Sequence, residues 1–141
     1  MPKHLLNIIL VAISLFVGAV IGFFTSSFIQ DLLGIPDLNS EEASSSKALI
    51  IFIVEIVRAI PTYWLYLNHD AALKTLKGSI IFGLMCSFLL ASLYIVLAPF
   101  SFEIHDVQRH ITNNVFIFTL QGIFCGYVLW KVQGKSFKVN T

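Results

Sequence analysis

Two ionisable side chains, Glu55 and Arg58, lie one helical turn apart inside a long apolar stretch of the sequence. Charges in the hydrocarbon core of a bilayer are costly, and they commonly mark proton relays, substrate paths or ion pairs. A spacing of three residues places both side chains on one face of a helix, where each charge can neutralise the other. The pair is therefore the first candidate functional site.

Three further residues extend this candidate site. Pro61 lacks a backbone donor, which frees a carbonyl acceptor within the helix for Arg58 or a water. Thr62 lies one turn beyond Arg58 and continues the polar face, whereas Gln121, in the last apolar stretch, is the expected partner across the bundle. The intramembrane candidates are thus Glu55, Arg58, Pro61, Thr62 and Gln121.

Two interpretations of the charged pair remain open at this stage. A structural ion pair would fix the register of its helix, and the proline would shape the bundle. Alternatively, Glu55 would be a proton or cation site on a helix that can move. The adjacent Arg58 would repel a cationic substrate, and an anionic group suits it better.

The elements that position these residues are long apolar stretches. The 141-residue chain is 57% hydrophobic and only 12% charged, against roughly 25% charged residues in soluble domains. We predict an all-α polytopic membrane protein, a single domain over residues 1–141 that forms a bundle of four transmembrane helices. The predicted spans are residues 5–28, 48–67, 80–98 and 115–130.

The distribution of lysines predicts the orientation, because cytoplasmic loops collect Lys and Arg near the ends of spans. We expect both termini in the cytoplasm and the protein in a bacterial inner (plasma) membrane. The first apolar stretch is longer than a signal-peptide core and no small-x-small cleavage site follows it, so we expect a retained anchor. The lysines on the predicted cytoplasmic side are Lys3, Lys74, Lys77, Lys131, Lys135 and Lys138, and the exceptions are Lys47 and Arg109.

Small residues recur at every fourth position along two of the predicted spans. Such ridges let helix backbones approach closely in lipid, where the hydrophobic effect between helices is absent. We favour packing within one chain, although packing between chains stays open. The predicted helix-packing residues are Ser14, Gly18, Gly22 and Ser26 in the first span, Ser79, Gly83, Ser87 and Ala91 in the third, and Gly122 and Gly126 in the fourth.

Other chemistry has weaker support in the sequence. Glu103, His105, Asp106 and His110 are residue types that bind divalent metals, but the spacing fixes no third ligand, so we expect no metal and no cofactor. The sequence shows no nucleophile with a base and no phosphate-binding glycine loop, which argues against an enzyme. A net charge of +1 gives no basic face for nucleic acid.

The sequence therefore predicts a small integral membrane protein that acts through helix–helix contacts with another membrane protein. Its role would be that of an accessory, assembly or immunity-type protein, and an outward-facing small ridge, for example at Gly18 or Gly122, would bind the partner. The alternative is a small oligomeric transporter or channel that uses the Glu55 and Arg58 face. The expected partners are the lipid bilayer and another membrane protein, or a second copy of this chain in a homo-oligomer.

Overall fold

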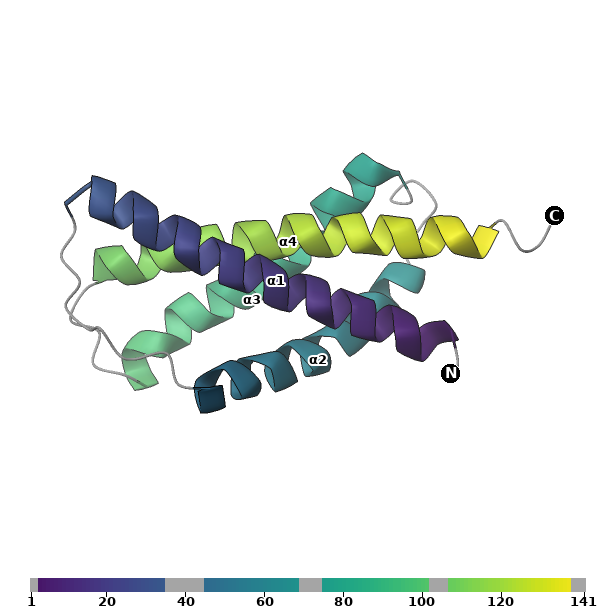
Figure 1. Cartoon of the computed structure of the whole chain (residues 1–141), viewed down its shortest axis with the longest axis horizontal. Coiled ribbons are helices and arrows are strands. Elements are labelled where there is room, and N and C mark those ends of the chain that lie inside the picture. The colour runs from purple at the N-terminus through teal and green to yellow at the C-terminus, as the bar shows by residue number, and fades with distance from the viewer. Residues whose placement is uncertain (1–2, 35–44, 69–74, 102–106, 138–141) are drawn as a thin grey trace.

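Among the residues that the structure describes, the chain forms four helices and no strand. The computed structural model describes residues 3–34, 45–68, 75–101 and 107–137. The predicted all-α class with four helices is thereby confirmed. The helices are α1 (Lys3–Leu32), α2 (Ser45–Leu67), α3 (Leu76–Ser101) and α4 (Val107–Phe137), and Figure 1 shows them in one view.

Local hydrogen bonds fix two of the helix ends. Gly34 follows α1 with a φ of 67°, in the left-handed region that glycine adopts without a steric penalty. There the Leu33 N–H donates to the carbonyl of Ile29 at 3.0 Å, which uses one of the last free acceptors of α1. Thr75 caps the start of α3, because its Oγ1 accepts from the N–H of Gly78 at 3.0 Å.

The helices are longer than the predicted spans. α4 begins at Val107, whereas the apolar pattern predicts a span from residue 115. Hydropathy locates only the part of a helix that lipid can cover, and backbone hydrogen bonds continue through polar residues beyond it. Two helical segments, Lys3–Leu32 and His110–Gln133, are long and apolar enough to cross a membrane, by length and composition. The apolar described part of α3, Leu76–Ser92, is shorter.

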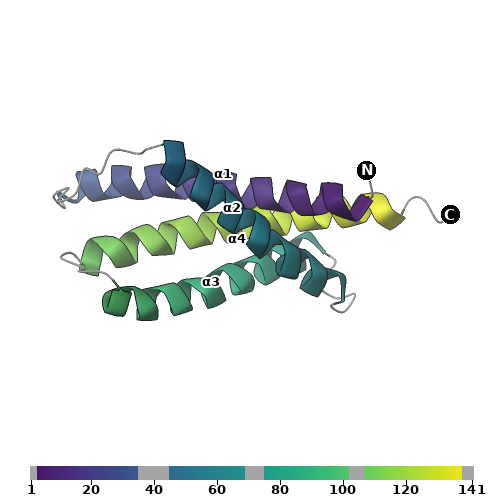
Figure 2. The same ribbon diagram turned by 90° about the horizontal axis from the view of Figure 1, so that it is seen from below.

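α4 lies between α1 and α3, and both neighbours run antiparallel to it (Figure 1). α2 crosses α1 obliquely and reaches α3 near its own C-terminal end, as Figure 2 shows. There the hydroxyls of Tyr66 and Ser79 share a hydrogen bond, and the Tyr66 and Phe82 ring centroids lie 5.3 Å apart. The first residue of α1 and the last of α4 lie at the same end of the molecule.

Small residues let the backbones of α1 and α3 approach the backbone of α4 closely. A Cβ atom on Gly18 would lie 2.7 Å from the Cα of Gln121, and one on Gly22 would lie 2.5 Å from the Cα of Ile117. On the other face of α4, a Cβ on Gly122 would lie 2.7 Å from the Cα of Leu84. Real Cβ atoms do not approach backbone so closely, so these backbones meet only because glycine is present.

The ridges therefore pack within the chain. The α1 ridge faces α4, as does the α3 ridge at Gly83, which meets Gly122 and Gly126. The idea that Gly18 or Gly122 lies on an outward-facing ridge is wrong, because both positions are buried against another helix of the same chain. The other ridge residues, Ser14, Ser26, Ser79, Ser87 and Ala91, are buried as well.

The apolar core gathers where α1, α2 and α4 meet and extends to Phe82 of α3. Cys125 lies in this core and Cys86 packs against it, and both are free thiols. Burial of small, polarisable side chains of this kind is ordinary packing. The buried residues of this core are Val11, Ala12, Leu15, Ala59, Tyr63, Tyr66, Phe82, Cys125, Leu129 and Val132.

Candidate functional site

One stripe of α2 turns toward the rest of the bundle, and it carries the charged pair. Glu55, Ala59 and Thr62 are buried on this stripe, followed one turn later by Tyr66. Their spacing of three or four residues is that of one helix face. The inward direction of the stripe explains how Glu55 is buried, since the rest of α2 is largely exposed and apolar.

Glu55, Arg58 and Gln121 form one hydrogen-bonded group, here named the central cluster. Arg58 Nη1 donates to Glu55 Oε1 at 2.9 Å and to Gln121 Oε1 at 3.1 Å. Gln121 Nε2 donates to the same Glu55 oxygen at 2.8 Å and lies 3.2 Å from the carbonyl oxygen of Leu15. The structure thus places the expected partner, Gln121, against both charges, and it joins three helices at one point.

The central cluster has neutral total charge but does not use all of its hydrogen-bonding atoms. Glu55 Oε2 and Arg58 Nε are buried and have no hydrogen-bond partner in the described part of the chain. The Arg58 guanidinium also lies 5.7 Å from the centroid of the Phe118 ring, a cation–π distance. Burial of an unpaired donor or acceptor costs free energy. The Glu55 oxygen therefore favours a proton or a water, and Arg58 Nε favours a water or another acceptor.

The Arg58 side chain is not fully enclosed by its own chain. Its side chain is 15% exposed, against 5% for that of Glu55. The helix face beside it carries apolar side chains. The arrangement can hold an ion pair, and it leaves a small part of the Arg58 side chain uncovered.

Pro61 and Thr62 do not join the central cluster. The Thr62 hydroxyl donates to the backbone carbonyl of Arg58 at 2.8 Å, one turn back along α2. Such back-bonding is a common way for threonine to satisfy its hydroxyl inside a helix. Pro61 lies within α2 on its exposed side, and the helix continues beyond it to Leu67. Thr62 therefore uses its hydroxyl within α2 and, contrary to the prediction from the sequence, does not extend the polar face toward the other helices.

Two further polar groups cross the interfaces of α1, and sequence reasoning missed them as sites. At one end, Asn7 Nδ2 donates to the Tyr63 hydroxyl at 2.8 Å, and His4 Nδ1 lies 3.2 Å from the same hydroxyl. At the other end, Gln30 Nε2 donates to Ser26 Oγ at 2.8 Å and lies 2.9 Å from Asn113 Oδ1. The central cluster lies between these two groups.

A signal for one missed residue was present in the sequence. Gln30 follows Ser26 by four residues and so continues the spacing of the small-residue ridge along α1. A polar side chain on that spacing must face the neighbouring helix, where it needs a partner. The partner of Asn7 had no comparable signal, because Tyr63 belongs to another helix whose position the sequence pattern does not fix.

The weak metal candidates are not tested by this geometry. Glu103, His105 and Asp106 lie outside the described residues. His110 lies in the first turn of α4, where its Nε2 is 3.1 Å from Asn114 Nδ2. Within the described part of the chain, no group of three His, Cys, Asp or Glu side chains could hold a metal ion.

The central cluster is the candidate functional site, because it combines buried charges, unused hydrogen-bonding atoms and a partly exposed arginine side chain. Comparison of the chain with protein-family models, with curated proteins and with solved structures finds no match.

Proposed function

We propose that the chain is a four-span integral membrane protein with both termini in the cytoplasm, and that it acts by binding another membrane protein. The binding edge is the outer side of α2 beside Arg58. The role is non-enzymatic, that of an accessory, assembly or immunity-type protein. The observation that carries the proposal is the partly open position of a charged Arg58 on an otherwise apolar helix face.

The lengths and outer surfaces of α2 and α3 support their placement in lipid. They contain 23 and 26 residues. At 1.5 Å per residue these lengths exceed the roughly 30 Å of a hydrocarbon core. Their outward side chains are large and apolar, with Val57 62% and Met85 68% exposed. Apolar surface of this extent is stable when lipid or protein covers it.

An arginine in this position favours a protein partner. Insertion scales give a cost of about 2.5–3.5 kcal/mol for arginine at the centre of a transmembrane helix. Glu55 and Gln121 offset this cost on the inner side, whereas a part of the Arg58 side chain stays exposed on the outer side. A second membrane protein that packs on α2 would exclude lipid from this exposed part.

The test is partner capture from membranes extracted gently into native lipid particles and weighed by native mass spectrometry. The wild-type protein should carry a different membrane protein at fixed stoichiometry. Val54→Ala together with Leu65→Ala should lose that partner, because both side chains are exposed and lie on the side of α2 that carries Arg58.

The matched control is Leu10→Ala together with Val17→Ala, which truncates one leucine and one valine on α1 that are 40% and 38% exposed, against 48% for Leu65 and 49% for Val54 on α2. The control should keep the partner. Retention of the partner by the α2 variant, with unchanged helix content in all three proteins, would rule out α2 as the binding edge.

A transporter or channel is the second candidate, and Glu55 is the observation that favours it. Its Oε2 atom is buried without a hydrogen-bond partner in the described residues, as a proton-carrying group in a membrane would be. For a proton-coupled carrier, Glu55→Gln should abolish flux in proteoliposomes while the protein stays folded. Full flux in a folded Glu55→Gln protein excludes this role, and a discrete homo-oligomer of the wild type would support it.

A further inference from the structure

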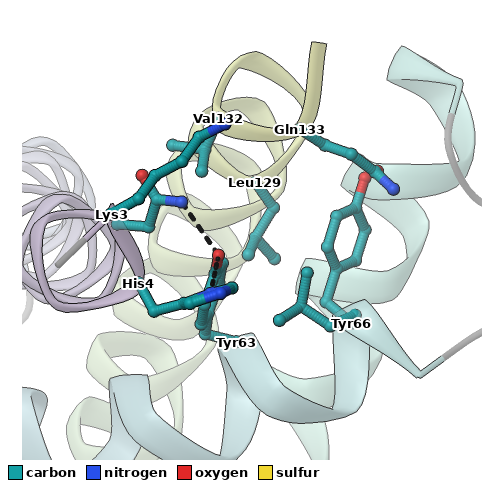
Figure 3. A pocket seen from close by; sticks show the side chains of 9 residues that line it. Lys3, His4, Tyr63, Tyr66, Leu129, Val132 and Gln133 are labelled. Carbon is teal, nitrogen blue, oxygen red and sulfur yellow. Dashed lines mark hydrogen bonds between the residues drawn. The ribbon is translucent and has the colours of Figure 1, made fainter. Parts of the chain in front are cut away.

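A small pocket opens at the end of the bundle where α1 begins and α4 ends. Its volume is about 40 Å³, and its lining side chains come from α1, α2 and α4, as Figure 3 shows. One buried water needs roughly 10–15 Å³ by the same measure, so the pocket has room for about three waters. It can therefore admit a phosphate group with a small polar substituent, whereas the acyl chains of a lipid would lie outside it.

The polar side of the pocket is arranged to donate hydrogen bonds. The Tyr63 hydroxyl accepts from Asn7 Nδ2 at 2.8 Å, so its own proton is available to His4 or to a ligand. One amide proton of Asn7 is engaged in that bond, and its second is not needed for it. Leu129 and Val132 supply an apolar wall on α4 (Figure 3).

The charge at the mouth of the pocket suits an anion. Lys3 and His4 lie there in the first turn of α1, and both are exposed. None of the nine lining residues is Asp or Glu. The N-terminal end of α1 adds the positive end of its dipole, but α2 ends at Leu67 in the pocket wall and α4 ends one turn beyond Gln133, each with the negative end of its dipole. The preference for an anion therefore comes from the side chains and not from the helix dipoles.

Gln133 gives the pocket one acceptor as well. Its Oε1 atom is buried and has no hydrogen-bond partner in the described part of the chain. A ligand that carries a hydroxyl or ammonium donor next to its negative charge would satisfy this oxygen. Such a pair of groups is found in a phosphate that bears a glycerol or ethanolamine substituent, whose donor would reach across the pocket to the Gln133 amide beside Tyr66 (Figure 3).

We propose that this pocket binds a phosphate group, held by Lys3, His4, Asn7 and Tyr63, with Gln133 accepting a donor beside it. The lipid bilayer is a source of this group if the chain spans the membrane as proposed above. At this end α4 also presents Lys131 over the rings of Tyr127 and Trp130, a composition typical of the membrane interface. A free phosphate is the second source of the same chemistry.

The experiment uses the full chain, freed of lipid in a zwitterionic detergent, and titrates it with three probes. The probes are short-chain phosphatidylglycerol, short-chain phosphatidylcholine, which lacks a headgroup donor, and inorganic phosphate. Native mass spectrometry should show one phosphatidylglycerol per chain, bound about tenfold more tightly than phosphatidylcholine. Tight binding of inorganic phosphate with the same dependence on the variants below would identify the free anion as the source.

Two variants and a matched control test whether the phosphate group binds in this pocket. Lys3→Gln and Asn7→Leu should each weaken binding about tenfold, because each removes a donor to a charged group. Lys131→Gln removes the same charge at the same end of the molecule, outside the pocket, and should leave binding unchanged. Lys3 is exposed, so its variant keeps the test valid if Asn7→Leu fails to fold.

The proposal is overturned if no probe binds, if Lys3→Gln binds as the wild type does, or if Lys131→Gln weakens binding equally. The measurement needs no protein partner. A failure here is therefore distinct from a failure of the partner capture described for α2.

Discussion

Arg58 is stabilised by three separate contacts, and their balance explains why an arginine can be kept inside an apolar helix. Glu55 supplies the opposite charge at 2.9 Å, Gln121 supplies an acceptor at 3.1 Å, and Phe118 supplies a ring face. Removal of one member of a buried pair leaves the other charge unpaired, which costs more than the pair contributes.

A double-mutant cycle tests this coupling. Arg58→Met alone should lower the free energy of unfolding by roughly 3 kcal/mol, because it leaves the Glu55 carboxylate buried with only Gln121 beside it. Glu55→Gln together with Arg58→Met should be less destabilising than the sum of the single changes, by about 1 kcal/mol or more. Thermal and denaturant unfolding in detergent measure both values, and strict additivity would show that the two side chains do not stabilise each other.

Sequence reasoning at this scale identified the charged pair and its partner because the cost of polar atoms in lipid singles them out. It failed for Thr62, since a threonine hydroxyl can bond to its own helix, and no sequence pattern distinguishes that bond from one across the bundle. It also missed Asn7, whose partner Tyr63 is 56 residues away.

At the scale of the helices, α4 is the central element because both of its faces meet small residues. Gly18 and Gly22 of α1 approach one face, whereas the other face presents its own Gly122 and Gly126 to α3. Close backbone approach supplies dispersion contacts that lipid cannot replace. α2 has no such ridge, and it is accordingly held by side chains along one narrow stripe.

Gly18→Leu tests whether the α1 ridge is internal. The new side chain would begin 2.7 Å from the Cα of Gln121, so α1 must move away from α4, and we expect a loss of at least about 3 kcal/mol or an unfolded bundle. Ser92→Leu adds comparable bulk at an exposed position of α3 and should change little. A Gly18→Leu protein that unfolds at the wild-type temperature would mean that the ridge faces lipid.

The periodicity of small residues predicted that close contacts exist, but not which helices share them. A ridge of small residues shows which face of a helix packs against another helix and how closely the two backbones can approach. It does not show which helix is the neighbour, because any helix with small side chains on one face can pack there. In the structure, Gly122 and Gly126 on one face of α4 contact α3, and Gln121 on another face contacts α1. The sequence lists these residues, but it does not show which helix each face of α4 contacts.

At the scale of the whole molecule, a partner can reach Arg58 within the membrane only if α2 and α3 cross the bilayer together with α1 and α4. Arg58 then lies at the depth of the lipid, where its partly exposed side chain favours a protein partner. α1 begins and α4 ends at one end of the molecule, as an even number of crossings requires. A pair of spans made by α1 and α4 alone would satisfy the same arrangement of ends, so the turn before α3 distinguishes the two topologies.

The most direct measurement is the labelling of an introduced cysteine, Lys77→Cys, in a protein whose own cysteines are replaced by Cys86→Ser and Cys125→Ala. A membrane-impermeant thiol reagent is applied to cells and, separately, to inverted membrane vesicles. Lys77 is exposed in the first turn of α3, and Lys3→Cys and Asp31→Cys serve as exposed markers for the two ends of α1. We predict that Lys77→Cys is labelled only from the side that labels Lys3→Cys, the cytoplasmic side. Labelling from the side of Asp31→Cys would show that α2 and α3 do not cross the membrane, and would contradict the proposed four-span topology.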